Sequence, residues 1–79
     1  MSDGISQQEY KTYVEVHRQL TDSIREELDA ASKYQRRRAY ARAAGYQSVA
    51  KLYDHIAGEE KHHSEELLKA SHQLKPKRE

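Results

Sequence analysis

Between Ser6 and Ala44 the chain contains neither glycine nor proline, the two residues that most often interrupt a helix. The stretch is rich in Glu, Arg, Ala, Leu and Gln, which are all good helix formers. Its start is typical of a capping box, in which Ser6 caps the helix and Glu9 reaches back to the Ser6 amide. A similar pattern recurs at residues 23–26, but one uninterrupted helix over about residues 7–44 is the favoured interpretation.

A second helix is predicted from about residue 48 to about residue 73, after a turn at residues 45–47. Gly45 stands where the end of a helix favours a residue with left-handed backbone angles. So short a connection makes the two helices antiparallel neighbours. Residues 74–79 are then a polar tail. We therefore expect a single all-α domain over residues 1–79, folded as an antiparallel two-helix hairpin.

A lone hairpin of this composition is expected to bury too little surface to offset the entropy lost on folding. Of the 79 residues, 35% are apolar and 34% are charged, and there is no Phe or Trp. Domains this small usually rely on disulfides, a metal or oligomerisation. The absence of Cys excludes disulfides, thiolate metal sites and iron–sulfur clusters. A metal held by His and carboxylates, self-association, or both remain.

Membranes and nucleic acids are not expected partners. Residues 1–8 are polar and lack the apolar stretch of a signal peptide, and no apolar run approaches the length of a membrane span. The net charge of +1 gives no broad field for either partner. The basic run at residues 36–38 fans around the helix, which favours a solvated face over a nucleic-acid site. We expect a cytoplasmic protein.

Both predicted helices carry a seam of mostly apolar residues at a spacing of about 3.5 residues. The first seam is Tyr13, His17, Leu20, Ile24, Glu27, Ala31, Tyr34, Arg38 and Ala41. The second is Val49, Leu52 or Tyr53, Ile56, Glu60, His63, Leu67, Ala70 and Leu74. Pairing through the turn matches positions whose numbers sum to about 91, because both helices rise equally per residue. Glu27 is therefore level with His63, and Glu60 lies one turn away.

Glu27, Glu60 and His63 have the chemistry of metal ligands. A Glu and a His three residues apart share one helix face and can reach one metal. Helix-bundle di-iron proteins combine a Glu from each of two helices with a Glu-x-x-His motif from each of the other two. The chain holds half of that set, so a two-fold homodimer would complete it. Iron, manganese or zinc suit these ligands better than calcium, although zinc, manganese or calcium can substitute for iron.

Simpler interpretations exist for each part of this pattern. Glu59 and His62 form a second Glu-x-x-His copy, but it points off the seam and is better explained as solvated. Glu27 alone could be a surface residue paired with a nearby Lys or Arg. The agreement of three ligand types at one level of two seams favours the metal site.

Around these residues the sequence resembles the ferritin-like superfamily, and specifically the rubrerythrin-type helical hairpin. The matching stretches are residues 27–34, Gly45-Tyr46, Val49-Ala50, Tyr53, Ile56-Ala57 and residues 59–63. Rubrerythrins carry both halves of the bundle in one polypeptide, whereas this chain has one. In that respect it is similar to the encapsulated ferritins, or half-ferritins, which build a ferroxidase site across a dimer interface.

The resemblance implies a role for each matching residue. Glu27, Glu60 and His63 would be iron ligands in a homodimeric four-helix bundle, with Glu60 and its symmetry mate bridging two irons. Tyr34 would place a hydroxyl near the metals. Glu26 and Asp29 lie where that family places acidic residues along the route by which iron reaches the site, although both are also ordinary surface charges.

The chain also departs from these relatives. The Cys-containing rubredoxin domain of rubrerythrins is absent, which disfavours peroxide reduction fed through a rubredoxin. Residues 75–79 lack the apolar residues of a tail that docks onto an encapsulin shell, so an encapsulin partner and compartment are weak expectations. The first helix overhangs the second before about His17. Apolar residues on that overhang are candidates for further contacts between subunits, in the dimer or in a higher oligomer of dimers, namely Tyr10, Tyr13, Val14 and Val16.

The sequence thus predicts a ferroxidase that oxidises ferrous iron with dioxygen or peroxide, for iron storage or detoxification, at a di-iron site shared by two chains. Two alternatives stay open. The same residues could hold a structural zinc or manganese ion in a non-catalytic dimer, or the chain could be a metal-free helical interaction module.

Overall fold

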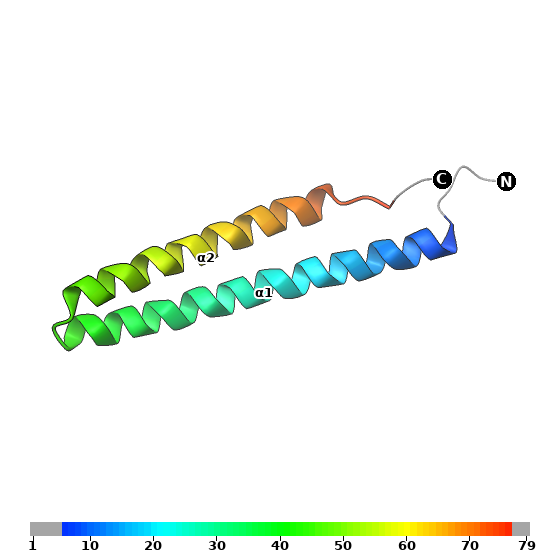
Figure 1. Cartoon of the computed structure of the whole chain (residues 1–79). Helices are drawn as coiled ribbons and strands as arrows, with labels where there is room; N and C mark the ends of the chain where they lie inside the picture. The colour runs from blue at the N-terminus through cyan, green and yellow to red at the C-terminus, as the bar shows by residue number, and fades with distance from the viewer. Residues whose placement is uncertain (1–5, 77–79) are drawn as a thin grey trace.

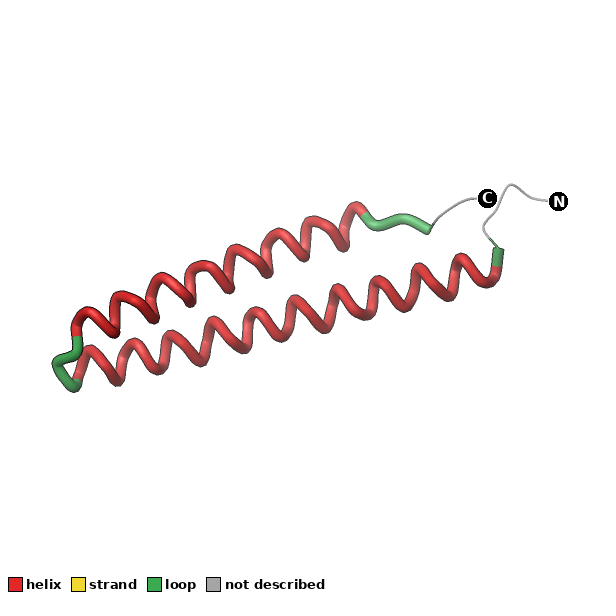
Figure 2. Tube along the Cα trace, in the orientation of Figure 1, coloured by secondary structure: helices red, strands yellow, loops and turns green. Residues whose placement is uncertain are grey.

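Two antiparallel helices make up the computed structural model, which describes residues 6–76. They are α1, Gln7–Ala43, and α2, Gln47–Gln73, and they lie side by side along their length (Figures 1 and 2). No strand occurs within residues 6–76. The hairpin is rod-shaped, with extents of 68 × 14 × 11 Å. The predicted all-α class is confirmed, while the end of the predicted polar tail lies outside the described residues.

The start of α1 is fixed by a side-chain cap. The hydroxyl oxygen of Ser6 accepts a hydrogen bond from the backbone N–H of Glu9 at 3.1 Å. Such a cap satisfies one of the amides that the first turn leaves without a backbone partner. The helix then continues through Ser23 without a break, so the predicted Ser6 cap and the predicted single helix are both confirmed. Glu9 Oε2 is buried without a hydrogen-bond partner, and the predicted contact of Glu9 with the Ser6 amide stays a prediction.

Gly45 ends α1 and turns the chain. Its φ of +90° is costly for residues with a Cβ and free for glycine. The amide of Tyr46 donates to the carbonyl of Ala41 at 2.8 Å, and the amide of Gly45 donates to that of Arg42 at 3.1 Å. This pair of bonds is the Schellman motif, which satisfies the last carbonyls of a helix. The two helices are therefore folded back on each other within three residues.

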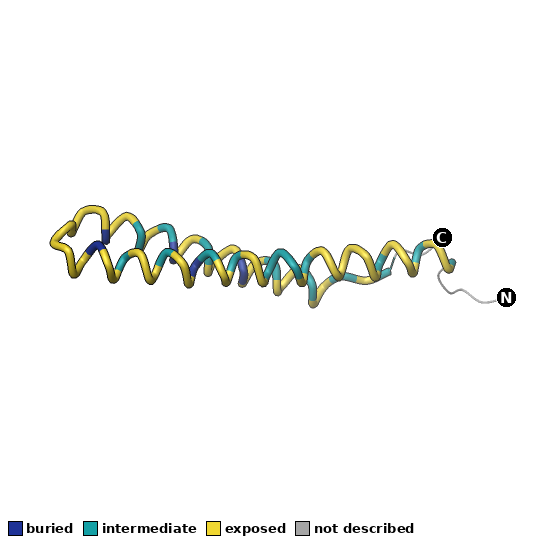
Figure 3. The backbone as a smooth tube through the Cα atoms, turned by 90° about the horizontal axis from the view of Figure 1, so that it is seen from below, coloured by how far each residue is buried: buried dark blue, intermediate teal, exposed yellow. Residues whose placement is uncertain are grey.

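The contact between the helices is built from small side chains. The buried residues are Ala31, Ala41, Ala50, Ala57 and Ser64. Polar contacts flank this strip: Arg38 donates to Asp54 at 2.7 Å across the helices. The buried positions lie in the half of the hairpin nearer the turn and in its middle (Figure 3). Toward the termini of residues 6–76, no residue is buried.

Many large apolar side chains have no cover in the hairpin. The exposed ones are Tyr10, Val14, Val16, Leu28, Tyr40, Tyr46, Val49, Leu52 and Leu68. Full burial of one such side chain is worth about 1.5–3 kcal/mol, and no side chain of that size is fully buried in the described residues. The hairpin therefore lacks a core of its own, as its composition predicts.

The structure corrects the predicted seams at several positions. His17, Val49 and Ala70 are exposed, whereas the buried residues of α2, Ala50, Ala57 and Ser64, are not members of its predicted seam. Of the two alternatives in α2, Tyr53 is half-buried and Leu52 is 56% exposed. Because two helices contact each other along a narrow strip, the outer residues of a seam stay exposed to solvent unless further helices cover them. Neither described helix has a segment long and apolar enough to cross a membrane.

Candidate metal centre

Three ligand-type side chains converge midway along the hairpin. Glu27 comes from α1, and Glu60 and His63 come from α2. Each offers one ligand atom, and these atoms all lie within 4.8 Å of one another. Within residues 6–76, no other group of three His, Asp or Glu side chains meets that condition. The structure thus brings together the three residues that the sequence predicts as ligands, and their role as ligands stays a prediction.

Helix geometry accounts for the convergence. The spacing of three residues between Glu60 and His63 puts both on one face of α2, directed toward α1. Across the helices, His63 Nδ1 lies 3.6 Å from Glu27 Oε2. The antiparallel pairing enforced by the short turn makes these two residues level, as the sequence analysis predicts.

Crowding of the two carboxyl groups raises the pKa of Glu60 above its ordinary value of 4.5. The largest cause is hydrogen bonding with the Glu27 side chain, which favours the protonated carboxyl, followed by desolvation and the negative charge of Glu27. The charge of His63 opposes these effects, and that of Glu59 adds slightly to them. The site therefore favours a cation, whether a proton or a metal ion.

Glu27 supplies a direct observation that fits a bound metal. Its side chain is 27% exposed, and its Oε2 atom is buried without a hydrogen-bond partner. A buried carboxylate oxygen without a partner is costly, and a cation beside it removes the cost. Imidazole nitrogen with carboxylate oxygens is a ligand set that iron, manganese and zinc accept. The residues present therefore fit a transition metal.

The centre is open on one side. The side chain of His63 is 51% exposed, and Glu60 is only half-buried. Three side chains are also too few to complete the coordination of two metal ions, which needs about six protein ligands in helix-bundle di-metal sites. One hairpin therefore holds half the number of ligand-type side chains found in helix-bundle di-metal sites.

Tyr34 lies next to Tyr53 rather than alone. Their rings stack with centroids 5.8 Å apart, and the cationic groups of Lys33 and Arg37 lie 5.7 and 5.8 Å from the Tyr34 ring. Tyr34 is seven residues after Glu27, and Tyr53 is seven before Glu60, so both rings are two turns from the centre toward the turn. The sequence predicted a role for Tyr34 but not its stacking on Tyr53. The equal spacing of the two tyrosines from Glu27 and Glu60 is the signal in the sequence that could have indicated this contact.

The remaining predicted residues lie on the surface. Glu26 and Asp29 are exposed on α1, flank Glu27 in sequence and do not join the cluster. Their predicted role in iron uptake stays a prediction.

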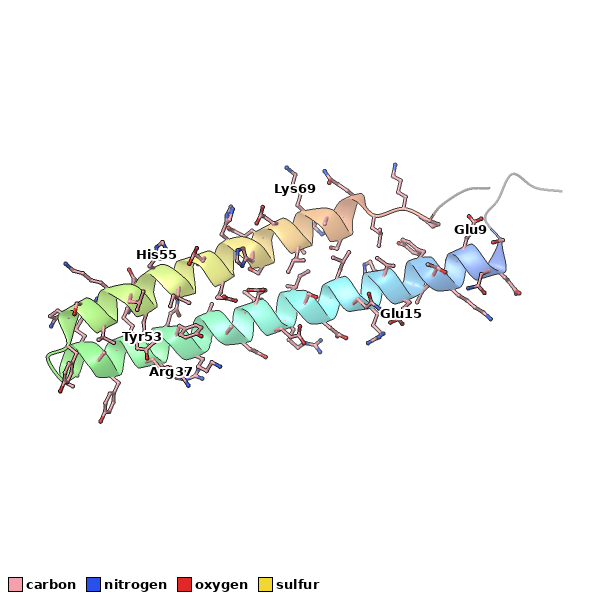
Figure 4. All side chains as sticks on the ribbon, in the orientation of Figure 1. Glu9, Glu15, Arg37, Tyr53, His55 and Lys69 are labelled. Atoms are coloured by element: carbon pink, nitrogen blue, oxygen red, sulfur yellow. The ribbon has the colours of Figure 1, made fainter. Side chains whose placement is uncertain are left out.

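The second Glu-x-x-His copy points away from α1. Glu59 pairs with His55 at 3.5 Å, and His62 lies 3.7 Å from Glu66, all on exposed side chains. Figure 4 shows His55 directed away from α1, while Tyr53 lies between the helices. This arrangement agrees with the prediction that the copy is solvated.

Comparison with known proteins gives one match. The family model described as Rubrerythrin matches residues 18–79. That range includes the three clustered residues, Tyr34 and the whole of α2, and it leaves out the first turns of α1. No curated protein and no solved structure matches the chain.

Proposed function

The chain belongs to the rubrerythrin family, and we propose that it is a ferroxidase whose di-iron site forms between two copies of the hairpin. The family match favours a di-iron, ferritin-like protein with redox chemistry. The observation that carries the finer proposal is the convergence of Glu27, Glu60 and His63 within 4.8 Å on an open face. A second copy related by a two-fold axis would bring the ligands to four Glu and two His.

Each side chain has a distinct task in this proposal. The Glu27 and Glu60 carboxylates neutralise the charge of the ferrous ions, and they tolerate the ferric state because they are anionic oxygen ligands. Glu60 and its symmetry mate would bridge the two ions. His63 fixes the position of each ion with a directional nitrogen ligand. Iron is the substrate here: each ferrous ion loses one electron to dioxygen or peroxide, and the ferric product leaves.

A metal-free interaction module is the second candidate, and one contact favours it. His63 Nδ1 lies 3.6 Å from Glu27 Oε2, so a protonated His63 could pair with Glu27 across the helices. In that case the cluster would contribute only to the contact between helices. The two candidates differ in what ferrous iron does to the protein.

Aerobic addition of ferrous iron tests the proposal. The expected result is dioxygen uptake with the appearance of ferric absorbance, at a rate well above that of iron in buffer alone. Zinc added beforehand is expected to suppress this rate, because it competes for the same carboxylates and imidazoles. A rate equal to that of the buffer would reject the ferroxidase and favour the structural or metal-free module.

Assembly gives a separate prediction. Because one chain offers three ligands, metal binding is linked to association, and metal is expected to shift the equilibrium toward the dimer or a multiple of it. Sedimentation velocity of the apo and iron-loaded protein at one concentration checks this. Tight binding of two irons by a monomer would contradict the shared site.

A further inference from the structure

One pair of aromatic side chains connects the two helices. The ring of Tyr34 in α1 stacks on the ring of Tyr53 in α2, with centroids 5.8 Å apart and ring planes inclined by 26°. The other close aromatic pairs within residues 6–76, Tyr10 with Tyr13 and Tyr13 with His17, both lie within α1. Tyr34 and Tyr53 are half-buried, and Figure 4 shows Tyr53 between the helices. Two phenol rings are therefore held against each other across the hairpin.

This pair is the set of tyrosines nearest to the candidate metal centre. Tyr34 follows Glu27 by seven residues and Tyr53 precedes Glu60 by seven, so both lie about 10.5 Å from the centre along the helices. A spacing of seven also keeps each tyrosine within about 20° of the helix face that carries the ligand-type residue. The other four tyrosines are 13 or more residues from the ligand-type residue of their own helix. An oxidant formed at the centre would therefore meet Tyr34 and Tyr53 first.

Positive charge beside Tyr34 determines how the pair can be oxidised. The cationic groups of Lys33 and Arg37 lie 5.7 and 5.8 Å from the centre of its ring. A ring that lost only an electron would become a cation beside these groups, and Coulomb repulsion disfavours that state. The electron and the phenolic proton therefore leave together, which gives a neutral phenoxyl radical. Part of its unpaired electron resides on the ring carbons ortho to the oxygen, and two such radicals join at those carbons.

From this geometry we propose that Tyr34 and Tyr53 form a site of oxidative modification, in which iron oxidation at the centre joins the two rings by a carbon–carbon bond. The inference rests on the proposed function, because ferrous iron and dioxygen supply the oxidising power. It goes beyond that function, because the chain modifies its own side chains and the product is a covalent link between α1 and α2.

The step balances without a further reactant. Dioxygen takes four electrons, one from each of two ferrous ions and one from each tyrosine, and becomes two molecules of water. Each tyrosine first loses its phenolic hydrogen as an electron and a proton. The two ortho carbons then form the new bond, and the hydrogens displaced from these carbons move to the oxygens and restore the phenols. The pair loses two hydrogen atoms in all, and solvent supplies the other two protons that water needs.

A covalent link at this place would supply what the hairpin lacks. The contact between the helices is built from Ala and Ser side chains, and no large side chain of the described residues is fully buried. The bond would close residues 34–53 into a loop of 20 residues, which restricts the unfolded chain as a disulfide does. It would also fix α2 against α1 two turns from Glu27 and Glu60, and so keep the ligand-type side chains level.

Mass spectrometry of the full-length protein after iron oxidation tests the inference. Ferrous iron is added in small portions in air, with catalase present to remove peroxide from solution. The expected product is a chain lighter by two hydrogen atoms, whose tryptic digest contains the peptides of Tyr34 and Tyr53 joined to each other. Dityrosine fluorescence is expected to appear with it. After removal of iron, the melting temperature is expected to be raised by roughly 10 °C or more.

Tyr10 and Tyr13 provide an internal control. Their ring centroids are 6.1 Å apart, close to the value for the interhelical pair, but both lie 14 or more residues from Glu27. Tyr10 is also 54% exposed, so an oxidant in solution would reach it readily. We expect both to stay unmodified. Tyr53→Phe, which keeps the ring and removes the phenol, is expected to abolish the cross-link, whereas Tyr10→Phe is expected to leave its yield unchanged.

The same samples separate failure of the inference from failure of the proposed function, because ferric absorbance is recorded throughout. If ferric iron forms rapidly while Tyr34 and Tyr53 stay unmodified, the inference is overturned and the ferroxidase stands. Equal modification of Tyr10 and Tyr13, or an equal yield from wild type preloaded with zinc, would place the oxidant in solution and also overturn it. Absence of iron oxidation above the rate in buffer would overturn both.

Discussion

Replacement of Glu60 by Ala is expected to lower the rate of iron oxidation at least a hundredfold. Glu60 is the carboxylate whose environment most strongly favours a bound cation, since its pKa is raised by Glu27 and by desolvation. In the proposed symmetric dimer, one substitution would remove both of the carboxylates proposed to bridge the irons. Loss of an outer residue that merely supports a metal ligand already costs roughly 10–100-fold, and loss of two ligands costs more. Stopped-flow absorbance of the ferric product measures the rate.

Glu59→Ala is the matched control for Glu60→Ala. It makes the same chemical change one residue earlier, on the outer face of α2. The Glu59 side chain is 56% exposed and contacts exposed His55 at 3.5 Å, a surface pair worth at most about 1 kcal/mol. We therefore expect its oxidation rate to stay within about twofold of wild type. If both variants lose activity equally, the cluster at Glu60 is not the site of oxidation.

The hairpin was predictable because its signals are local. The capping pattern at Ser6 and the left-handed position at Gly45 each need only a few neighbouring residues, and both appear in the structure. The position of Glu27 opposite His63 along the paired helices then follows from the length of the turn. Sequence patterning could not tell which seam residues become buried. Val49 and His17 belong to the predicted seams but are exposed, because two helices bury a narrower strip of each other than the helices of a four-helix bundle do.

The surroundings of the candidate centre were less predictable than its members. The stacking of Tyr34 with Tyr53 depends on the rotation of α2, and the seam left Leu52 and Tyr53 as equal alternatives. A surface hollow near the turn is likewise lined by side chains from α1, the turn and α2 together. Such features follow from three-dimensional packing, which no periodicity within one helix specifies. The predicted role of Glu26 and Asp29 in iron entry stays a prediction, because an exposed acidic side chain looks the same whether or not iron passes it.

Removal of one proposed ligand is expected to stabilise the metal-free fold, and Glu27→Gln is the variant that tests this. The folded-state pKa of Glu60 is raised, so the folded chain holds that proton more tightly than the unfolded chain does. Apo stability therefore falls as the pH rises from about 4.5 through the raised pKa, and the loss is complete above it. Glu27 is the largest cause of that shift, and Gln keeps its volume without its charge.

The apo Glu27→Gln variant should accordingly melt no lower than apo wild type at pH 7, and its melting temperature should depend less on pH between about 4.5 and 7. Ferrous or zinc ion should raise the melting temperature of wild type far more than that of the variant, because stabilisation by a ligand follows its affinity for the folded state. Thermal melts at one protein concentration, with and without metal, measure both effects. Glu26→Gln is the control, since it removes the same charge from an exposed neighbour outside the cluster.

The opposite outcome for the apo protein has an equally definite meaning. If Glu27→Gln melts well below wild type, the 3.6 Å contact between His63 and Glu27 acts as an ion pair that holds the helices together. A cluster with that behaviour is a structural contact, and the interaction module would replace the ferroxidase as the better account of this chain.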